Sequence, residues 1–444
     1  MTTMQKNRLW NKNFTIITLG TVVSTLGMAL SSFAISLMVL DLTKSTFLYA
    51  LYMVAHNFPK MFAPIIAGPF LDRFSRRRVI YTLDFFSATL YLGLYFLLTS
   101  GLSSGPVFYP IFLAVTFIMG SVDGVYSVAY ESLYPNLVTE GNLSKAYSVS
   151  SMIFPLATFM MPVASLIYGT LGSIAPLMLL NSATYLVAAI FETQIRCDEK
   201  HVDRGGGATS LKRYTDDFRL GLNYIKNEKG LLRITAYFGI NMFTGSALGV
   251  LMLPFFQENA ENIDFTRYID LLDSAVSKLG IFGSVVITVS TLYSIYAVVG
   301  VLGRLIGGFI HYKVKYPLKA RFAIALGVYA LYTIIDGSML FMPYPIMMLF
   351  AFISGVSGVT SFTIRTAATH SYVPDSYRAR FAGTFSMIMT CGTLLGQLIV
   401  GLLGEVFDPK MIVLTFNIIN MFAVYFVVYR GREDIKKIYN REVD

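Results

Sequence analysis

Six acidic or basic side chains lie away from the ends of the long apolar stretches of this chain, where a charge needs a specific reason. They are His56, Lys60, Asp84, Asp123, Arg304 and Asp336. Placing a charged side chain in hydrocarbon costs at least about 2.5 kcal/mol on insertion scales, so residues found there are candidates for a functional site. A buried carboxyl group can alternate between protonated and ionised forms, and Asp123 is the first candidate for such a proton-linked role. Arg304 and Asp336 are more readily explained as packing or gate charges than as substrate contacts.

Lys60 and His56 lie one helical turn apart in the second apolar stretch, so a helix would place both on one face. Lys60 could pair with Asp84 or Asp123, contact a substrate, or extend its amine towards the membrane surface. For Asp123, the alternative to proton transfer is a structural pair or a gate contact with a basic residue at the inner face.

Other motifs with chemical potential are absent from the sequence. The four histidines are dispersed and form no cluster with metal-ligand spacing, and there is no Walker sequence for nucleotide binding. Cys197 and Cys391 form no disulfide framework. We therefore expect no enzymatic activity, no bound metal and no cofactor.

The composition indicates that water is not the main solvent of this protein. Of the 444 residues, 55% are apolar and 14% are charged, whereas soluble domains carry about 25% charged residues. Apolar stretches of roughly 20 residues, the length that crosses a bilayer as a helix, recur along the chain. Alternating strands of about ten residues, which a membrane barrel requires, are absent. The sequence thus predicts an all-α polytopic membrane protein.

Twelve apolar stretches qualify as transmembrane helices. They are residues 14–40, 46–71, 79–99, 107–127, 147–168, 175–193, 232–256, 282–310, 322–341, 346–363, 381–403 and 411–429. We expect the acidic connection 257–280 to be an external surface loop.

The basic residues predict the orientation of these helices. Most of the 35 lysines and arginines lie in the N-terminus and in the loops on one side, so the positive-inside rule places both termini in the cytoplasm. We expect the protein in the plasma (inner) membrane. The net charge of +9 does not indicate nucleic acid as a partner, because the basic residues cluster in alternate loops.

The chain divides into two related halves around a polar segment. We expect an N-terminal six-helix bundle over residues 1–195, a cytoplasmic linker over 196–230 and a C-terminal six-helix bundle over 231–444. Residues 217–234 fit an amphipathic helix at the inner membrane surface or an ordinary solvated linker helix.

A faint internal repeat supports the two pseudo-symmetric bundles. The sequence around Pro135 resembles that around Pro374, and the same offset aligns Gly68 with Gly307. Duplicated bundles would enclose a substrate cavity between them near the middle of the membrane.

The short stretch that begins at Gly68 combines an acid with four arginines between two apolar stretches. Its pattern, Gly-x-x-x-Asp-Arg-x-x-Arg-Arg-Arg, resembles the signature loop between the second and third helices of the major facilitator superfamily. The resemblance implies that Asp72 meets the N-terminus of a helix from the second half when the inner gate is closed. It also implies that Arg73, Arg76, Arg77 and Arg78 lock the loop and face lipid headgroups. Alternatively, these arginines only satisfy the positive-inside rule.

Further stretches resemble one branch of that superfamily. Residues 373–380 resemble a Val-Pro-Asp-x-x-Arg-x-Arg loop between helices ten and eleven, and residues 41–45 resemble a Leu-Thr-x-Ser turn after the first helix. Both look like the branch that contains macrolide-efflux and enterobactin-exporter proteins together with lysophospholipid flippases. Drug–proton antiporters of the superfamily often carry an arginine in helix four and a Gly-Pro pair in helix five. The corresponding stretches here lack both.

The resemblance implies a secondary active transporter that exports hydrophobic or amphipathic small molecules, such as drugs, macrolides or siderophore-like metabolites. It would work as a monomer in the lipid bilayer by alternating access, with protons as the expected coupling ion. One alternative is a lysophospholipid carrier or flippase of the same superfamily. Another, from a different functional class, is a membrane receptor or scaffold that transports nothing.

Overall fold

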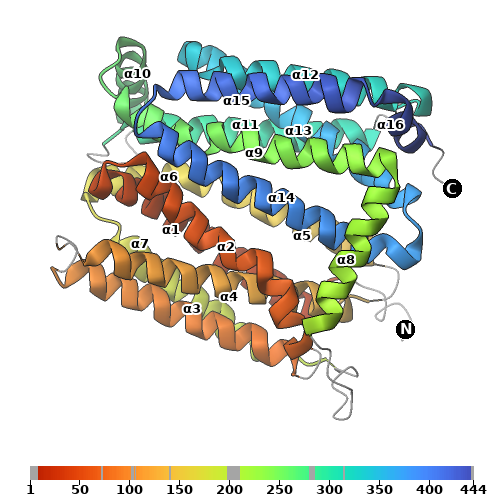
Figure 1. Cartoon of the computed structure of the whole chain (residues 1–444). Helices are drawn as coiled ribbons and strands as arrows, with labels where there is room; N and C mark the ends of the chain where they lie inside the picture. Colours follow the sequence, from red (N-terminus) through yellow and green to blue (C-terminus); the bar gives the residue numbers. More distant parts are fainter. Residues whose placement is uncertain are drawn as a thin grey trace. The chain divides into compact units, whose positions relative to one another are not determined.

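Backbone hydrogen bonding determines the secondary structure of a chain this apolar. In hydrocarbon every peptide N–H and C=O must be satisfied within the protein, and a helix does so inside one segment. A computed structural model of the chain describes residues 9–71, 74–101, 105, 107–139, 142–197, 211–279, 286–313 and 316–441. All the regular secondary structure of these residues is helical, as Figure 1 shows.

Twelve helical stretches of the described residues have the length of a membrane span, which needs about 20 residues. The first six are α1 (Lys12–Thr43), α2 (Thr46–Leu71), α3 (Arg76–Thr99), α4 (Phe108–Leu137), the pair α5 (Leu143–Ala157) and α6 (Met160–Leu171), and α7 (Ala175–Glu192). The second six are α9 (Lys229–Glu258), α11 (Val289–Lys313), α12 (Arg321–Ser338), α13 (Tyr344–Tyr372), α14 (Asp375–Gly404) and α15 (Pro409–Ala423), which a π-helical turn extends over Val424–Tyr429.

Eleven of these twelve stretches are also apolar enough to cross a membrane over the residues that the structure describes. The twelfth, α2, has 26 residues, but some of its side chains lie outside the described part of the chain. The predicted all-α membrane fold, with twelve spanning helices in two six-helix bundles, is confirmed.

The fifth span is divided into α5 and α6 near a proline. α5 ends at Ala157, two residues after Pro155, and α6 begins at Met160. Pro162, the third residue of α6, has no N–H to bond to the carbonyl of Thr158, and its ring disturbs that turn of helix. The N–H of Thr158 bonds to the carbonyl of Pro155, three residues back. The span therefore passes through one tightened turn.

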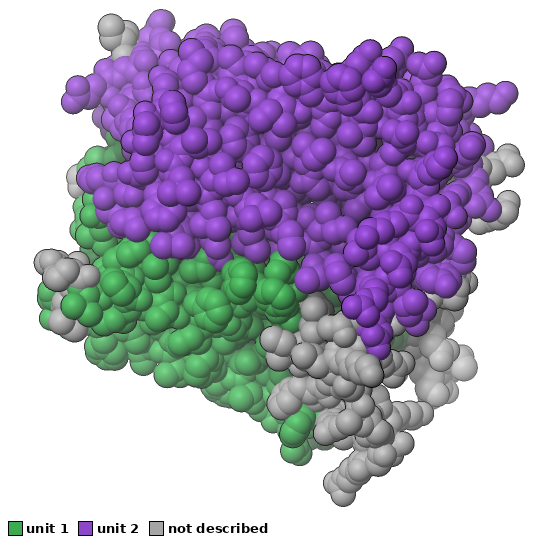
Figure 2. All heavy atoms as spheres, viewed as in Figure 1, with its two compact units in different colours: residues 1–42, 55–211, 280–288 green, residues 43–54, 212–279, 289–444 purple. Residues whose placement is uncertain are grey.

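The chain forms two compact units, coloured separately in Figure 2. Unit 1 comprises Met1–Leu42, Ala55–Leu211 and Gly280–Thr288, and unit 2 comprises Thr43–Val54, Lys212–Leu279 and Val289–Asp444. The start of α2 groups with unit 2, where the Glu405 carboxylate accepts hydrogen bonds from Ser45 Oγ and Phe47 N, both at 2.7 Å. A carboxylate at a helix N-terminus satisfies free N–H groups and interacts favourably with the helix dipole.

Within unit 1, α3 packs along α7 and against α4. A buried apolar cluster joins the start of α1, the end of α2, the start of α3 and the end of α4, with Phe14, Leu71, Ile80 and Leu133 among its members. This packing fixes the register of the helices that carry most of the candidate residues.

Within unit 2, α9 packs against α14 and α15, and α11 packs against α13. Small residues allow these close crossings. A Cβ at Gly355 of α13 would collide with the backbone of Gly300 in α11, and one at Gly392 of α14 would collide with the backbone of Gly239 in α9. Small residues at such crossings are the usual way for membrane helices to gain contact area.

Two of the remaining helices are α8 (Leu211–Asn227) and α10 (Ile263–Leu279). The predicted amphipathic segment 217–234 includes the end of α8 and the start of α9, with a break at Glu228. α10 lies in the connection that was expected to be a surface loop. It is anchored by Phe265, whose ring stacks on Phe256 with centroids 4.8 Å apart.

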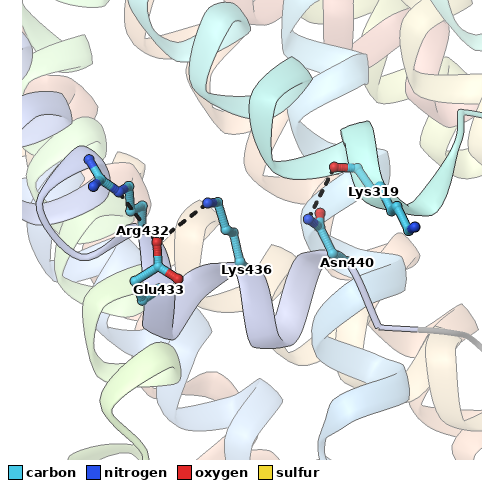
Figure 3. Close-up of polar contacts among 5 residues, drawn as sticks. All are labelled: Lys319, Arg432, Glu433, Lys436 and Asn440. Atoms are coloured by element: carbon cyan, nitrogen blue, oxygen red, sulfur yellow. Dashed lines mark hydrogen bonds and ion pairs between the residues drawn. The ribbon is translucent and has the colours of Figure 1, made fainter.

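The C-terminal helix α16 (Arg432–Tyr439) packs against the first turn of α12 (Figure 3). The Asn440 side chain accepts a hydrogen bond from Phe322 N at 3.0 Å and donates one to the Lys319 carbonyl at 3.2 Å. Nearby, the buried hydroxyl groups of Tyr329 and Tyr439 form a hydrogen bond of 2.9 Å. One amide thus satisfies both a donor and an acceptor next to the start of α12.

Candidate functional site

The crossing of α2 and α4 in unit 1 depends on two glycines. A Cβ at Gly120 of α4 would collide with the carbonyl oxygen of His56, and a Cβ at Gly124 would collide with the Ala63 side chain and approach Lys60. Because these glycines are four residues apart, they form one smooth strip along α4. The strip lets α2 approach closely enough for its basic side chains to reach α4.

Three side chains meet at this crossing and form what we call the Asp123 cluster: Asp123 of α4 with His56 and Lys60 of α2. The distance from Lys60 Nζ to Asp123 Oδ2 is 3.2 Å. The distance from His56 Nε2 to the same oxygen is 3.4 Å, and that from Lys60 Nζ to His56 Nε2 is 2.9 Å. Lys60 thus contacts His56, one turn earlier on the same helix. Its acidic partner is Asp123 rather than Asp84.

The contacts of His56 determine which of its ring nitrogens carries hydrogen. An ammonium group has only donors, so His56 Nε2 accepts the hydrogen bond from Lys60. The ring also hydrogen-bonds to the backbone of Thr116, which its other nitrogen can reach as a donor. The arrangement therefore contains a neutral imidazole beside an ammonium–carboxylate pair.

The Asp123 cluster borders a cavity of about 180 Å³ inside unit 1. This is close to the size of a cavity that accommodates one benzene molecule. Its lining comes from α1, α2, α3, α4 and α7 and consists of Thr21, Ser24, Thr25, Met28, Lys60, Asp84, Ser87, Val122, Asp123, Tyr126 and Tyr185. Most of these residues carry a hydroxyl, carboxyl or ammonium group on an otherwise apolar wall, so the cavity suits an aromatic or a polar group of a ligand.

A second acidic site lies beside the cavity. The carboxyl group of Asp84, in α3, is within hydrogen-bonding range of that of Glu192, the last residue of α7. The two residues are 1% and 0% exposed. The hydroxyl group of Tyr126 lies 3.5 Å from Glu192 Oε1. On the other side, a Cβ at Gly20 of α1 would lie 3.2 Å from the same oxygen.

Glu192 was missed in the sequence analysis. It stands one residue before the end of the predicted span 175–193, where an acid is readily interpreted as a solvated helix end. Its significance becomes visible only from the packing of α3 along α7. The signal available in the sequence was an acidic residue inside the bounds of a predicted span.

A model of the Major Facilitator Superfamily matches residues 17–341, a range that includes the Asp123 cluster and the Asp84–Glu192 pair. The chain belongs to the Major Facilitator Superfamily. The resemblance inferred from the signature loop is therefore confirmed at the level of the superfamily.

Individual relatives are distant. The uncharacterized MFS-type transporter YkuC of Bacillus subtilis (strain 168) is 25% identical over 252 residues, which cover 55% of this chain and 56% of YkuC. The chain thus matches a little over half the length of this curated relative.

Solved transporters share the fold. The crystal structure of the nucleoside transporter NupG has a TM-score of 0.65 at 12% identity and covers 94% of this chain and 98% of that one. A variant of the peptide transporter POT has a TM-score of 0.67 at 10% identity and covers 95% of each chain. Similarity at these identities shows the major facilitator fold alone.

Two arginines of the superfamily's signature loop make contacts inside unit 1. Arg76 donates to the carbonyl of Ser132 at 3.0 Å, and Arg77 donates to the carbonyl of Ile195 at 2.6 Å. Ile195 lies just beyond α7, where carbonyl groups lack intrahelical donors, so Arg77 caps that helix end. Arg76 ties the start of α3 to the last two turns of α4. Gly68 lies in α2, with surroundings outside the described residues. Asp72 and Arg73 also lie outside the described residues.

The two candidate charges of unit 2, Arg304 and Asp336, both interact with Tyr332. Asp336 of α12 is 3% exposed and accepts hydrogen bonds from Ser354 Oγ at 2.9 Å and from the Tyr332 hydroxyl. Arg304 of α11 is exposed and interacts electrostatically with Tyr332. Arg304 and Asp336 thus share a neighbour within unit 2, whereas the Asp123 cluster belongs to unit 1.

Arg365 of α13 is a further intramembrane charge that the sequence analysis missed. Its guanidinium carbon lies 4.8 Å from the centre of the Phe238 ring and 4.7 Å from that of Phe385. Such contacts stabilise a cation through the negative faces of the rings. The predicted span 346–363 ended before Arg365, whereas α13 continues to Tyr372.

Proposed function

We propose that this chain is a proton-driven secondary transporter that exports amphipathic small molecules across the plasma (inner) membrane, with both termini in the cytoplasm. The observation that carries the proposal is the Asp123 cluster at the wall of a polar cavity. Family membership supports transport, and the chemistry of this site supports the finer assignment of coupling and cargo. Efflux and antiport are accordingly parts of the proposal.

The size and lining of the cavity favour one part of a substrate rather than a whole drug molecule. A volume of about 180 Å³ accommodates one aromatic ring or a compact polar group. The lining offers hydroxyl groups, two carboxyl groups and one ammonium group. We therefore assign to this site a cationic or hydrogen-bond-donating group of an amphipathic molecule, while its apolar part is bound elsewhere.

Competition for Asp123 provides a route to proton coupling. In the structure the Asp123 carboxylate is neutralised by Lys60. A proton or a cationic group of the substrate can replace this contact, but the two cannot occupy the same oxygen together. Exchange of one for the other at alternate sides of the membrane is antiport, and it needs no arginine in helix four.

The rest of the mechanism follows the superfamily. Two six-helix bundles, proposed over residues 1–195 and 231–444, would alternate in opening to each side, with the segment 196–230 as a cytoplasmic linker. The proposed inner-gate residues are Gly68, Asp72, Arg73, Arg76 and Arg77. The protein would act as a monomer.

The test is uptake into energised inside-out vesicles that contain the full-length protein. The panel includes macrolides, lipophilic amines, catecholate siderophores, a nucleoside, a dipeptide and labelled lysophospholipid, each with and without an uncoupler. We expect uncoupler-sensitive uptake of an amphipathic amine in the wild type and its loss in Asp123→Asn. Glu131→Gln is the matched control, because Glu131 is an exposed acid further along α4; uptake should survive in it.

Each other outcome contradicts part of the proposal. Uptake that persists in Asp123→Asn would remove this residue from coupling. Movement of lysophospholipid alone would assign the chain to lipid transport. Uptake of nucleoside or dipeptide alone would replace the amphipathic cargo with a polar one.

A further inference from the structure

Both carboxyl groups of the Asp84–Glu192 pair are almost completely buried, so bulk solvent does little to stabilise a negative charge on either. Asp84 is 1% exposed and Glu192 0%. Among the described residues, no lysine, arginine or histidine forms an ion pair with either carboxyl group. One oxygen on each, Asp84 Oδ2 and Glu192 Oε2, is buried without a hydrogen-bond donor. Two ionised carboxylates would therefore face each other almost completely shielded from solvent and, among the described residues, without an ion-pair partner to offset their repulsion.

The contact between the Asp84 and Glu192 carboxyl groups constrains how many protons the two groups carry. An ionised carboxylate only accepts hydrogen bonds, so two of them cannot bond to each other. One carboxylic acid O–H can, however, donate to the other group as a carboxylate. This is the arrangement in which two close carboxyl groups share one proton and titrate as a pair.

We propose that Asp84 and Glu192 share one proton as a carboxylic acid–carboxylate pair, a proton-binding site separate from the Asp123 cluster. In balanced form, the pair holds one proton and a net charge of −1. Releasing the proton leaves two facing carboxylates, and binding a second proton makes the pair neutral. The role of the Asp84–Glu192 pair in transport rests on the proposed function. Its protonation state does not depend on that function.

The surroundings of the pair connect it with the cavity. Asp84 lines the cavity together with Asp123 and Lys60, so a proton can reach it through water there. The titratable groups that face the pair are Tyr126 of α4, Tyr185 of α7 and Asp123 itself, which interacts electrostatically with Asp84. A change of charge at Asp123 therefore alters the electrostatic free energy of the negative charge on the Asp84–Glu192 pair.

Infrared spectroscopy of the full-length protein in liposomes tests the shared proton directly. A protonated carboxyl group has a C=O stretching band that a carboxylate lacks. We expect part of this band at neutral pH to be lost in the variant that combines Asp84→Asn with Glu192→Gln. Asp123→Asn is the matched control, since it removes an acid from the same cavity; its spectrum should keep that part of the band.

Each single variant provides a second route to the same result. In Glu192→Gln, for example, the amide N–H supplies the donor that the acid supplied, so the remaining carboxylate is ionised and the hydrogen bond is kept. A band that is unchanged in the double variant would overturn the proposal, because both groups would then be ionised in the wild type.

A transport measurement separates failure of this proposal from failure of the proposed function. We expect Glu192→Gln to lose uncoupler-sensitive uptake but to keep exchange of labelled for unlabelled substrate. Proton-driven uptake that survives in this variant would remove the pair from coupling. Absence of proton-driven uptake in the wild type would contradict the proposed function, while the infrared result would still decide whether the pair holds a proton.

Discussion

The charges of the Asp123 cluster are arranged so that each compensates another. Lys60 and Asp123 are about one-third and one-quarter exposed at their side chains, so neither is fully removed from polar surroundings. His56 adds an acceptor for the ammonium group rather than a third charge. A partly buried pair of this kind is stable mainly because removing one member leaves the other uncompensated.

A double-mutant cycle measures this compensation. We expect Lys60→Met alone to destabilise the protein more than the combination of Lys60→Met with Asp123→Asn, with a coupling of about 1 kcal/mol at this partial exposure. Thermal unfolding in detergent provides the measurement. Additive effects of the two substitutions would show that the ion pair does not contribute to stability.

Some of these residues were predictable from the sequence and others were not, for a physical reason. The proximity of His56 and Lys60 follows from helical periodicity within one segment, so it was predictable. The choice of Asp123 over Asp84 as the partner of Lys60 depends on the glycine strip of α4, which involves two helices. Glu192 was missed because its environment is created by packing between segments distant in the sequence.

At the scale of the helices, the α2–α4 crossing is the element that creates the site. Gly120 and Gly124 contact backbone or Cβ atoms of α2. These atoms cannot move aside without shifting the whole helix, so the crossing distance is sensitive to a single side chain.

We expect Gly124→Leu to destabilise the protein by about 2 kcal/mol or more through overpacking, and to abolish transport by separating Lys60 from Asp123. Gly93→Leu is the matched control, because a Cβ there meets nothing within 4 Å. Thermal unfolding and vesicle uptake of both variants check the prediction. Equal effects of the two substitutions would argue that the strip does not position the site.

The amide of Asn440 has a comparable role for α16. We expect Asn440→Ala to cost about 1–2 kcal/mol, because the carbonyl of Lys319 and the N–H of Phe322 lose their partner. Hydrogen exchange of α16 measures this loss locally. Lys436→Ala, which removes the surface pair with Glu433 shown in Figure 3, is the control and should change stability by less than about 0.5 kcal/mol. Protection of α16 that is unchanged in Asn440→Ala would contradict the assignment.

The twelve spans were predictable because each one has a local signal, a run of apolar residues that the membrane requires to be helical. The helix α10 gives no such signal, since it is short and acidic and is held by the stacking of Phe265 on Phe256. The position of Arg365 inside α13 was also missed, because apolarity ends earlier than the helix does.

For the whole molecule, membership of the Major Facilitator Superfamily is shown, while the direction of transport and the cargo are proposals. The expectation of a substrate cavity between the two halves remains a prediction. The cavity inside unit 1 adds a defined chemical site to that expectation, with the Lys60–Asp123 ion pair and Asp84 in its wall and with His56 and Glu192 beside these residues. These groups favour exchange of protons for a substrate that carries a cationic or donor group.

The most direct test of the central claim is proton movement in proteoliposomes that contain the purified protein and an internal pH indicator. With the substrate found in vesicle uptake, adding it outside should drive protons out of the proteoliposomes with the wild type and with Glu131→Gln, but not with Asp123→Asn. Substrate entry without proton movement would contradict proton-driven antiport. Proton movement that is equally large in Asp123→Asn would contradict the role of the Asp123 cluster.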